Sequence, residues 1–381
     1  MESDDLIYRK LQKHLDRMPV GFPESKSGAE IKILKELFTA DEAEIALELS
    51  MLPESAERIL PRMKNKFNSV DELEAKLDNM FAKGLIIGGK ILSRDSNKKL
   101  YSNTQYIVGI HEMQFDRINK SLMGNTINYV FNDFYNEFSK DGVPVQMRTI
   151  PIQKSIIRDN YVETYDNIKD LILGTKGQIV MINCVCKNGM DAIGMPCKAT
   201  ELRETCMIFD VFAESLIEGS KGRVITKEEA ISLVNKFEEI GLVAQPENNK
   251  KPEFLCFCCG CCCGVLNMIK KFPKPADHYE SNYYAVVDTE ACSGCGTCVT
   301  RCQMDAISLA DEKAVVDLDR CIGCGLCTST CKTGAAVLNR KKDAVVPPEN
   351  HDDLYKKIFM KKVGPMSAVK TIIKYKLGMK V

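Results

Sequence analysis

The chain has 381 residues, 45% of them apolar, so it is long enough for two or three domains that each bury a core. Its 52 basic and 52 acidic side chains cancel, which gives no overall attraction to nucleic acid or to an anionic membrane. The opening MESDDLIYRK lacks the apolar core of a secretion signal, and no apolar run approaches the length of a membrane span. We therefore expect a cytoplasmic protein without a transmembrane segment.

Residues 1–110 are expected to form a domain of amphipathic helices. GAEIKILKELF, ADEAEIALELS and ESAERILPRMK have helical spacing of apolar residues, and Pro61 would kink or split the third. SVDELEAKLDNMFAKGLI adds a fourth helix with Ser69 or Asp71 as its N-cap. IIGGKILSRDSNKKLYSN reads as two short strands with a wing between them. This order of elements resembles a winged-helix domain.

The winged-helix resemblance implies DNA binding, but the charge pattern argues against it. Acidic residues dominate the helix that would enter the groove: Asp71, Glu72, Glu74 and Asp78 stand against Lys76 and Lys83. The wing adds the cations Lys90, Arg94, Lys98 and Lys99. A helix that contacts phosphates should be net basic. We therefore expect this domain to have a protein-contact or packing role, and we do not expect DNA as a partner.

Residues 111–175 are expected to connect this domain to the rest of the chain, first as helix and then irregularly. His111 and Glu112 are adjacent candidates for chemistry in this segment. One histidine beside one acid is a weak signal, so we expect a satisfied structural pair.

All 18 cysteines lie between Cys184 and Cys331, and the first 183 residues have none. A cytosolic setting keeps thiols reduced, so disulfides are not expected. Clustered thiols in such a protein indicate metal binding. Because exposed thiolates and clusters oxidise readily, an anaerobic or strongly reducing setting is expected.

Residues 176–275 are expected to form a cysteine-rich, metal-binding domain. QIVMIN predicts a buried strand, so Cys184 and Cys186 after it would face the same way on an extended chain. A loop would return Cys197, and KATELRETCMIF would be a helix carrying Cys206. These four thiolates could complete one metal site.

Six further cysteines follow within eight positions, between a predicted helix that begins at Thr226 and a short helix in GVLNMIKKF. They are Cys256, Cys258, Cys259, Cys261, Cys262 and Cys263. The ten thiols of this domain could hold two additional [4Fe–4S] clusters, or one cluster or zinc ion plus a different centre. They could also be redox-active or substrate-binding thiols near one cluster, or a structural zinc site with inert neighbours. Thiolates suit both zinc and iron–sulfur, and the eight further cysteines of residues 280–342 favour iron–sulfur for at least one site.

Residues 280–342 carry the strongest motif, two copies of C-x2-C-x2-C-x3-C. The first copy is Cys292, Cys295, Cys298 and Cys302, and the second is Cys321, Cys324, Cys327 and Cys331. This is the bacterial spacing for [4Fe–4S] clusters, in which the fourth cysteine serves the other cluster. Cluster 1 is then expected on Cys292, Cys295, Cys298 and Cys331, and cluster 2 on Cys321, Cys324, Cys327 and Cys302.

The two copies belong to an internal repeat. AVVDTEACSGCGTC starts at Ala285 and AVVDLDRCIGCGLC starts at Ala314, 29 residues later. The stretch resembles the clostridial-type dicluster ferredoxins, which implies a ferredoxin-like βαββαβ module. Gln303 and Lys332 stand where that family usually has proline after the fourth cysteine.

Residues 343–381 are expected to be a basic helical tail, because ten lysines and four acids lie between 341 and 381. MSAVKTIIKYKLGMK could be an amphipathic helix that docks on an acidic partner or a membrane surface. It could equally be a solvated helix on its own ferredoxin domain.

The sequence as a whole predicts an α+β protein of several domains that handles electrons. The whole chain resembles uncharacterised iron–sulfur proteins of anaerobes that begin with a winged-helix-like domain. We find no phosphate loop or dinucleotide fingerprint. The first hypothesis is an electron-transfer protein or subunit with a redox partner protein. The alternatives are a redox enzyme, possible as an oxidoreductase component, with its centre on residues 256–263, and a redox-sensing winged-helix regulator.

Overall fold

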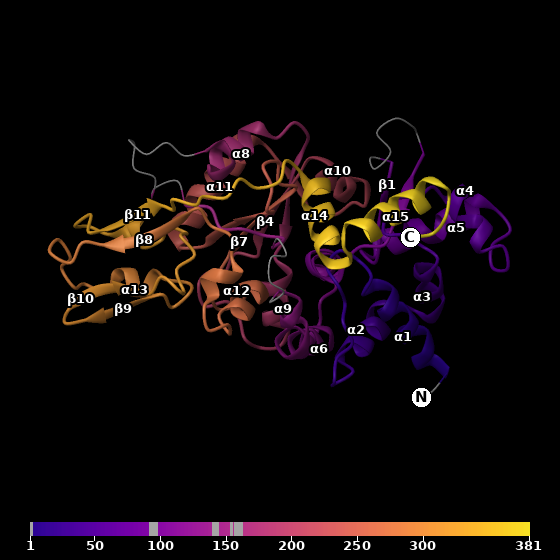
Figure 1. Ribbon diagram of the computed structural model, residues 1–381, viewed down its shortest axis with the longest axis horizontal. Helices are drawn as coiled ribbons and strands as arrows, with labels where there is room; N and C mark the ends of the chain where they lie inside the picture. Colours follow the sequence, from indigo (N-terminus) through magenta and orange to yellow (C-terminus); the bar gives the residue numbers. More distant parts are fainter. Residues whose placement is uncertain (1–2, 91–97, 139–144, 153–154, 156–162) are drawn as a thin grey trace.

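The computed structural model describes residues 3–90, 98–138, 145–152, 155 and 163–381. Three regions follow one another along its long axis, with the N-terminal helices at one end, a sheet in the centre and the ferredoxin-like region at the other end (Figure 1). Among the described residues, no helix is long and apolar enough to cross a membrane.

The N-terminal region consists of helices and one pair of short strands. Its helices are α1 (Ser3–Leu15), α2 (Ala29–Leu37), α3 (Ala40–Leu47), α4 (Ala56–Ile59), η1 (Leu60–Arg62) and α5 (Val70–Ala82). Ser69 caps α5 as predicted, because its side chain accepts a hydrogen bond from the Glu72 backbone N–H. Pro61 lies in the 3-10 turn that ends α4.

The two strands predicted around the wing are present. β1 (Ile87–Gly89) pairs antiparallel with β2 (Leu100–Ser102). The wing itself, at 91–97 with Arg94, lies outside the described residues. The winged-helix resemblance therefore stays a prediction, although each of its helices and strands occurs where the sequence indicated.

A connecting stretch joins this region to the central sheet. It contains η2 (Tyr106–Ile110), η3 (Glu112–Gln114), α6 (Lys120–Tyr129), η4 (Val130–Phe134), α7 (Tyr135–Phe138), η6 (Thr164–Asp166) and α8 (Ile168–Gly174). Helix α6 packs on α2, so the stretch extends the N-terminal core.

The central sheet has five antiparallel strands in the order β5-β3-β4-β7-β6. They are β3 (Ile179–Asn183), β4 (Glu204–Phe209), β5 (Arg223–Ile225), β6 (Val243–Pro246) and β7 (Phe254–Cys258). One face packs on α8 and α11 (Lys227–Ile240), and the other on α9 (Val185–Ala192) and α10 (Asp210–Glu218). Helix α12 (Gly264–Ile269) follows the cysteine run. Because side chains alternate along a strand, each strand contributes to both faces.

Two local predictions for this region are wrong. The end of KATELRETCMIF is strand β4, because it pairs with β3 on one side and β7 on the other, and this pairing satisfies its backbone. Cys186 lies in the first turn of α9 and not on an extended chain, since the strand ends at Asn183 and Cys184 takes the N-cap position.

The ferredoxin-like region has the predicted order βαββαβ. Its elements are β8 (Tyr283–Val287), α13 (Thr297–Arg301), β9 (Ile307–Ala310), β10 (Lys313–Val316), η8 (Thr328–Thr330) and β11 (Ala336–Arg340). The first strand pairs with the last, and the two middle strands pair with each other. The repeat therefore forms two small sheets related by approximate two-fold symmetry.

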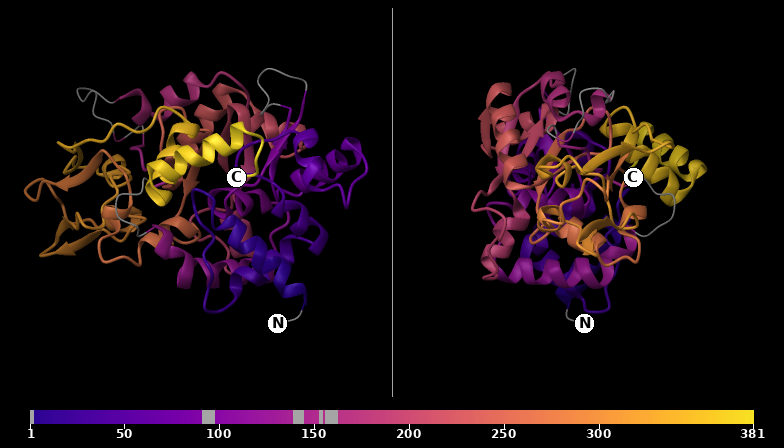
Figure 2. Two further views of the ribbon diagram at one scale, coloured as in Figure 1. Left: turned by 45° about the vertical axis from the view of Figure 1, so that its right-hand side comes forward. Right: turned by 90° about the vertical axis from the view of Figure 1, so that its left-hand side faces the viewer.

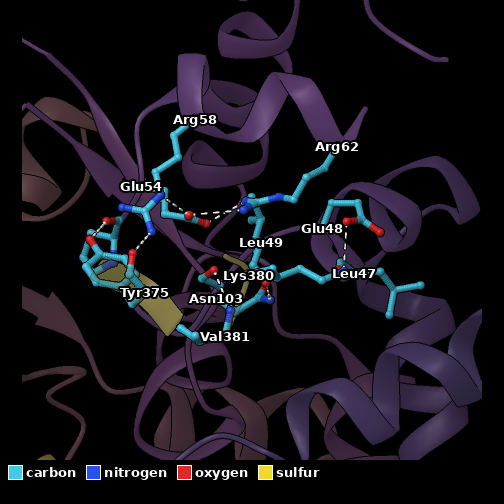
Figure 3. A network of polar contacts seen from close by, with 12 residues as sticks. Leu47, Glu48, Leu49, Glu54, Arg58, Arg62, Asn103, Tyr375, Lys380 and Val381 are labelled. Atoms are coloured by element: carbon cyan, nitrogen blue, oxygen red, sulfur yellow. Dashed lines mark hydrogen bonds and ion pairs between the residues drawn. The ribbon is translucent and has the colours of Figure 1, made fainter. Parts of the chain in front are cut away.

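The basic tail forms α14 (His351–Val363) and α15 (Pro365–Lys376), which run from the central sheet to the N-terminal region (Figures 1 and 2). The alternative that it packs on its own ferredoxin domain is therefore wrong. Figure 3 shows the anchor: the Arg58 guanidinium lies 4.2 Å from the Tyr375 ring centroid, and Lys380 Nζ is 2.9 Å from a Glu48 carboxylate oxygen. The Met51 backbone N–H also donates to the last carbonyl, on Val381, at 3.0 Å.

Candidate iron–sulfur and metal centres

The two cysteine loops of the ferredoxin-like region make the same hydrogen bonds. The Ala285 backbone N–H donates to Cys321 Sγ at 3.4 Å, and the Ala314 N–H donates to Cys292 Sγ at 3.5 Å. Each first strand therefore supports the cysteine of the other repeat. Backbone donors to sulfur stabilise thiolates and tune the potential of a cluster.

The last cysteine of each loop is supported in the same way. The Ala306 N–H donates to Cys302 Sγ at 3.2 Å, and the Ala336 N–H donates to Cys331 Sγ at 3.4 Å. The first pair of bonds matches at the 29-residue offset of the repeat, whereas Ala336 lies one position beyond the residue that corresponds to Ala306. The duplication in the sequence is therefore also a duplication of sulfur environments, apart from this shift.

Glycines hold these loops close to neighbouring backbone. Gly294 and Gly323 have φ of 69° and 65°, a region that favours glycine. A Cβ on Gly294 would collide with the Glu312 carbonyl oxygen, and one on Gly323 with the Tyr283 carbonyl oxygen. The tight loops, the sulfur donors and the spacing all fit cubane clusters.

Electrostatic interactions indicate how these thiols group. Burial raises the pKa of Cys324 well above its usual value, and the charges on Cys327 and Cys302 raise it further. Burial also raises the pKa of Cys327 to about 11, with a smaller contribution from Cys302. Cys302 therefore lies close enough to the second loop to interact with its thiols.

The ten middle cysteines fall into two groups on opposite sides of the central sheet. Cys256 and Cys258 are two residues apart on β7 and share the face of α9 and α12, while Cys259 turns to the α11 side. Cys206 lies directly opposite Cys256 on the neighbouring strand.

We call the larger group the six-cysteine centre. It comprises Cys184, Cys186, Cys206, Cys256, Cys258 and Cys263. Hydrogen bonds between neighbouring thiols link the six cysteines in a closed ring. Its order is Cys184, Cys186, Cys263, Cys258, Cys256, Cys206 and back to Cys184. Hydrogen bonds from Cys186 and Cys206 lower the pKa of Cys184 well below its usual value. Interactions with neighbouring thiols and burial raise the pKa of each of the other five thiols well above its usual value. Cys184 is therefore the one member of the ring whose surroundings favour thiolate, the form that binds metal.

We call the smaller group the four-cysteine site. It comprises Cys197, Cys259, Cys261 and Cys262, whose sulfurs all lie within 4.8 Å of one another. Cys197 Sγ is 3.6 Å from Cys259 Sγ, and Cys261 Sγ is 3.4 Å from Cys259 Sγ and 3.6 Å from Cys262 Sγ. A tetrahedral ion with metal–sulfur bonds of about 2.3 Å places its sulfurs about 3.8 Å apart. These thiols therefore fit one tetrahedral zinc ion, whereas cubane ligands bind four different irons.

This division differs from the set expected from the sequence. Cys184, Cys186 and Cys206 lie together, but Cys197 lies with the run and not with them. The reason is that Cys197 sits in the loop after α9, which leads to the other face of the sheet. All ten cysteines nevertheless have sulfur neighbours.

Lys187 lies between the two groups. It is 1% exposed, and its Nζ donates to Thr205 Oγ1 at 2.7 Å and to the Phe257 carbonyl at 3.2 Å. Burial lowers its pKa, but the thiolates of Cys184 and Cys259 more than offset this and raise it. The buried cation therefore compensates negative charge on both cysteine groups.

Two uncharged polar side chains complete the surroundings of the six-cysteine centre. Gln245 Nε2 lies 3.9 Å from Cys263 Sγ, and Gln245 is fully buried opposite Cys256 on β6. Burial raises the pKa of Tyr279 well above its usual value, and the charges on Cys263 and Cys258 add to this shift. Sequence reasoning missed Gln245, Tyr279 and Lys187. Only Gln245 had a signal, its place in a hairpin with the cysteine run.

His111 and Glu112 lie near the same centre, close enough to interact with Cys184. Burial lowers the pKa of His111 to about 4. Burial also raises the pKa of Glu112 to about 8, although its carboxylate accepts a hydrogen bond of 2.6 Å from the Gly109 N–H. The pair is thus enclosed next to sulfur, which the sequence alone did not indicate.

The ferredoxin-like region is joined directly to the cysteine run. Gln303 Oε1 accepts from the Gly260 N–H at 2.6 Å, and Gln303 Nε2 donates to the Gly241 carbonyl at 3.1 Å. Proline at this position could make neither bond. The unusual residue after the fourth cysteine thus holds the two regions together.

The comparisons with known proteins agree with this geometry in one region. The family described as a 4Fe-4S dicluster domain matches residues 291–335, which include all eight cysteines of the two loops. A search of the curated proteins gave no match. With the cysteine cluster in the middle of the chain, this match supports an iron–sulfur protein.

Proposed function

We propose that this protein transfers electrons between two [4Fe–4S] clusters in its ferredoxin-like region and an iron–sulfur centre at the six cysteines. Cys292, Cys295, Cys298 and Cys331 would hold one ferredoxin cluster, and Cys321, Cys324, Cys327 and Cys302 the other. Bound clusters supply one-electron transfer. The chain supplies their spacing, their shielding from water and the charges that tune them.

One observation carries this proposal: the second ferredoxin loop and the six-cysteine centre share a buried apolar cluster. Ile322 and Leu326, from that loop, belong to the same packed cluster as Cys258, Cys263 and Leu266. Continuous packing without intervening water suits electron transfer between two centres. A protein that only stored metal would not need its thiols against a ferredoxin loop.

The four-cysteine site is proposed to bind zinc. Its sulfurs have the short, nearly equal separations of a single tetrahedral site. Hydrogen bonding from Cys262 lowers the pKa of Cys259 to about 5, and Lys187 contributes to this shift. A zinc ion there would fix residues 256–263 relative to α9 and α11. It would thereby stabilise the arrangement of the six cysteines on the opposite face of the sheet.

Metal and sulfide analysis of protein purified without oxygen tests both assignments. Two cubanes account for about 8 iron and about 8 sulfide per chain. We expect this amount, about one zinc, and additional iron at the six-cysteine centre. Cys256→Ser should lose the additional iron and keep zinc, while Cys259→Ser should lose zinc and keep the iron, so each variant controls the other. Iron that stays near 8 in the wild type would contradict an iron centre in the middle region.

Reduction kinetics test whether electrons pass from the ferredoxin clusters to the middle centre. With an EPR signal assigned to each centre through these variants, reducing the ferredoxin clusters should be followed by reduction of the middle centre. Cys324→Ala, which removes a ligand on the shared side, should abolish the second phase. A middle centre that is reduced equally fast in this variant would refute the relay.

A DNA-binding regulator is less well supported. Two of the wing lysines pair with acids of their own domain: Lys99 Nζ lies 2.6 Å from Asp78, and Lys98 Nζ lies 3.0 Å from Glu57. Cations already paired in this way contribute less to phosphate binding. A gel shift on random duplex at low salt, expected to show no binding, separates this alternative from electron transfer.

A further inference from the structure

A large cavity opens beside the six-cysteine centre. It has a volume of about 1250 Å³ and lies between the cysteine face of the central sheet, the N-terminal region and the helices α14 and α15. Small-molecule sites typically measure about 300–1000 Å³. The space is therefore ample for an organic molecule, and it is built from three regions that lie far apart in the sequence.

All six cysteines of the centre line this cavity, as do Cys259 and Cys262. None of the eight ferredoxin cysteines is among its described lining residues. Cys186, Cys206 and Cys256 keep partial accessibility although they lie on an inner helix and on central strands. The cavity explains this accessibility, so a molecule in it could approach the sulfurs from the side away from the ferredoxin-like region.

Apart from Glu112, which lines the cavity near Cys184, the walls next to the sulfurs are largely apolar. Val185, Ile208, Phe212 and Val265 lie there, and α14 and α15 add apolar side chains from the opposite side. The buried cation Lys187 is already bound to Thr205 and to a backbone carbonyl. Charged side chains such as Lys251 and Lys356 line other parts of the cavity. An apolar molecule with few polar atoms matches such walls.

Electron transfer narrows the chemical class. Iron–sulfur centres exchange electrons singly, so an organic partner must be able to hold one electron between two transfers. Conjugated carbonyl compounds of the quinone type meet this requirement and are predominantly apolar. Their reduction is balanced by two electrons and two protons, which convert the quinone into the hydroquinone.

We propose that this cavity is the binding site of an apolar, quinone-type carbonyl compound that exchanges electrons with the six-cysteine centre. The inference rests on the proposed electron-transfer function and names the small molecule at that site. In the reducing direction, electrons from a one-electron donor enter the ferredoxin-like region, and the protons come from solvent. The proposal also gives the C-terminal helices a role, since α14 and α15 form one wall of the binding site and are anchored to the N-terminal region.

Menadione, a small naphthoquinone, is a suitable probe for binding. Equilibrium dialysis against oxidised holo-protein without oxygen should give about one bound molecule per chain. Val211→Trp and Val265→Trp would fill the cavity from two different helices and should each weaken binding by about tenfold or more. Val224→Trp, on a strand residue that is 50% exposed and outside the cavity lining, is the matched control and should bind as the wild type does.

A surface site is the main competing explanation. Leu377, on the C-terminal side of α15, is 72% exposed and does not line the cavity, so Leu377→Lys should leave binding unchanged. Loss of binding in Leu377→Lys, or wild-type affinity in both cavity-filling variants, would overturn the proposal. Unchanged iron and zinc contents in these variants show that the centres remain intact.

A redox readout follows on the same samples. Protein reduced with dithionite and freed from the excess should convert about one menadione to menadiol for every two electrons it stored. Cavity-filling variants should store the same number of electrons but pass them to menadione more slowly. If iron analysis finds no metal at the six cysteines, the electron-transfer proposal fails, and the dialysis result still decides the cavity separately.

Discussion

The ferredoxin-like region and the middle region both gather thiols, but by different structural means. In the ferredoxin-like region, three of the four proposed ligands of each cluster come from one continuous loop, and only the fourth would cross over. In the middle region, strands β4 and β7, the end of β3 and the starts of α9 and α12 all contribute to one centre. The first arrangement follows from the spacing of cysteines in the sequence, whereas the second forms only when the strands of the sheet have paired.

This difference changes what each site needs from the rest of the fold. The ferredoxin loops are supported by their own repeat, through hydrogen bonds such as that from Ala285 to Cys321. The middle sites depend on the register of a five-stranded sheet, in which Cys206 must stand opposite Cys256. Damage to a middle ligand should therefore spread further than damage to an outer ferredoxin ligand.

The largest expected effect is the loss of the proposed zinc. In Cys259→Ala the site keeps three thiolates, and structural zinc in small domains contributes about 10–16 kcal/mol of binding free energy at neutral pH. We expect a loss of about 5 kcal/mol or more in unfolding free energy, measured by urea unfolding followed by circular dichroism. Cys295→Ala, at an exposed outer ligand, should lose one cluster while the central sheet stays folded.

Equal destabilisation by these two substitutions would remove the contrast between the regions. Retention of zinc in Cys259→Ala would contradict the four-cysteine site itself. Zinc measured per chain before and after dialysis distinguishes the two results.

A smaller effect is expected from pH, through the contact between the sheet and the C-terminal helices. His351 Nδ1 lies 2.6 Å from a Glu247 carboxylate oxygen. Burial alone would lower the pKa of His351, but Glu247 raises it from 6.5 to about 9. The stabilisation is fully present below pH 6.5 and is lost as pH rises through 9. It should amount to about 3 kcal/mol.

Urea unfolding of the wild type and His351→Gln at pH 6 and pH 10 measures this term. The wild type should lose stability over this range by about 3 kcal/mol more than the variant. An equal loss in both proteins would assign the pH dependence to other groups. Cluster absorbance of the ferredoxin-like region should not follow the titration of this pair.

The sequence predicted much of the ferredoxin-like region because its information is local. Spacing, glycines and the repeat indicated the loops, and the element order followed. The helices of the N-terminal region after α1 were also predicted, since apolar periodicity and caps such as Ser69 are local signals. The tail helix was predicted, but its place against Arg58 and Glu48 was not, because nothing local specifies a partner 317 or more residues away.

The middle region was predicted less well for the same reason. Cys206 was predicted on a helix because its segment lacks a strong alternation of apolar and polar residues. The segment is a strand because it pairs with β3 on one side and β7 on the other. The rule that residues i and i+2 share a face was applied to Cys184 and Cys186, where the chain turns into a helix. Applied to Cys256 and Cys258 on β7, it would have indicated the six-cysteine face.

Gln303 offers a more local way to weaken the connection between the two regions. Gln303→Pro restores the residue that ferredoxins usually have but removes two hydrogen bonds to the middle region. At about 1 kcal/mol for each bond, the unfolding free energy should fall by about 2 kcal/mol. Electron transfer from the ferredoxin clusters to the middle centre should also slow, while the ferredoxin clusters keep their spectrum.

The corresponding position in the second repeat provides the control. Lys332→Pro also introduces proline directly after a fourth cysteine, 29 positions later. It should leave the transfer rate unchanged. A similar slowing in both variants would show that proline disturbs the clusters themselves and not the contact between the regions.

The smallest expected effect concerns the charge between the two middle sites. Lys187→Met keeps the length of the side chain but removes a buried cation that interacts with Cys184 and Cys259. Reduction adds negative charge to a centre, so losing the cation should lower the reduction potential of the six-cysteine centre. A fall of about 60 mV corresponds to about 1.4 kcal/mol for one electron.

Lys227→Met is the matched control, because this lysine also donates to backbone carbonyls, at Leu173 and Thr175. EPR-monitored titration should show the fall only in Lys187→Met and only at the middle centre. An equal fall at the ferredoxin clusters would mean that the two regions share one electrostatic environment, which would contradict the separate tuning that their different construction implies.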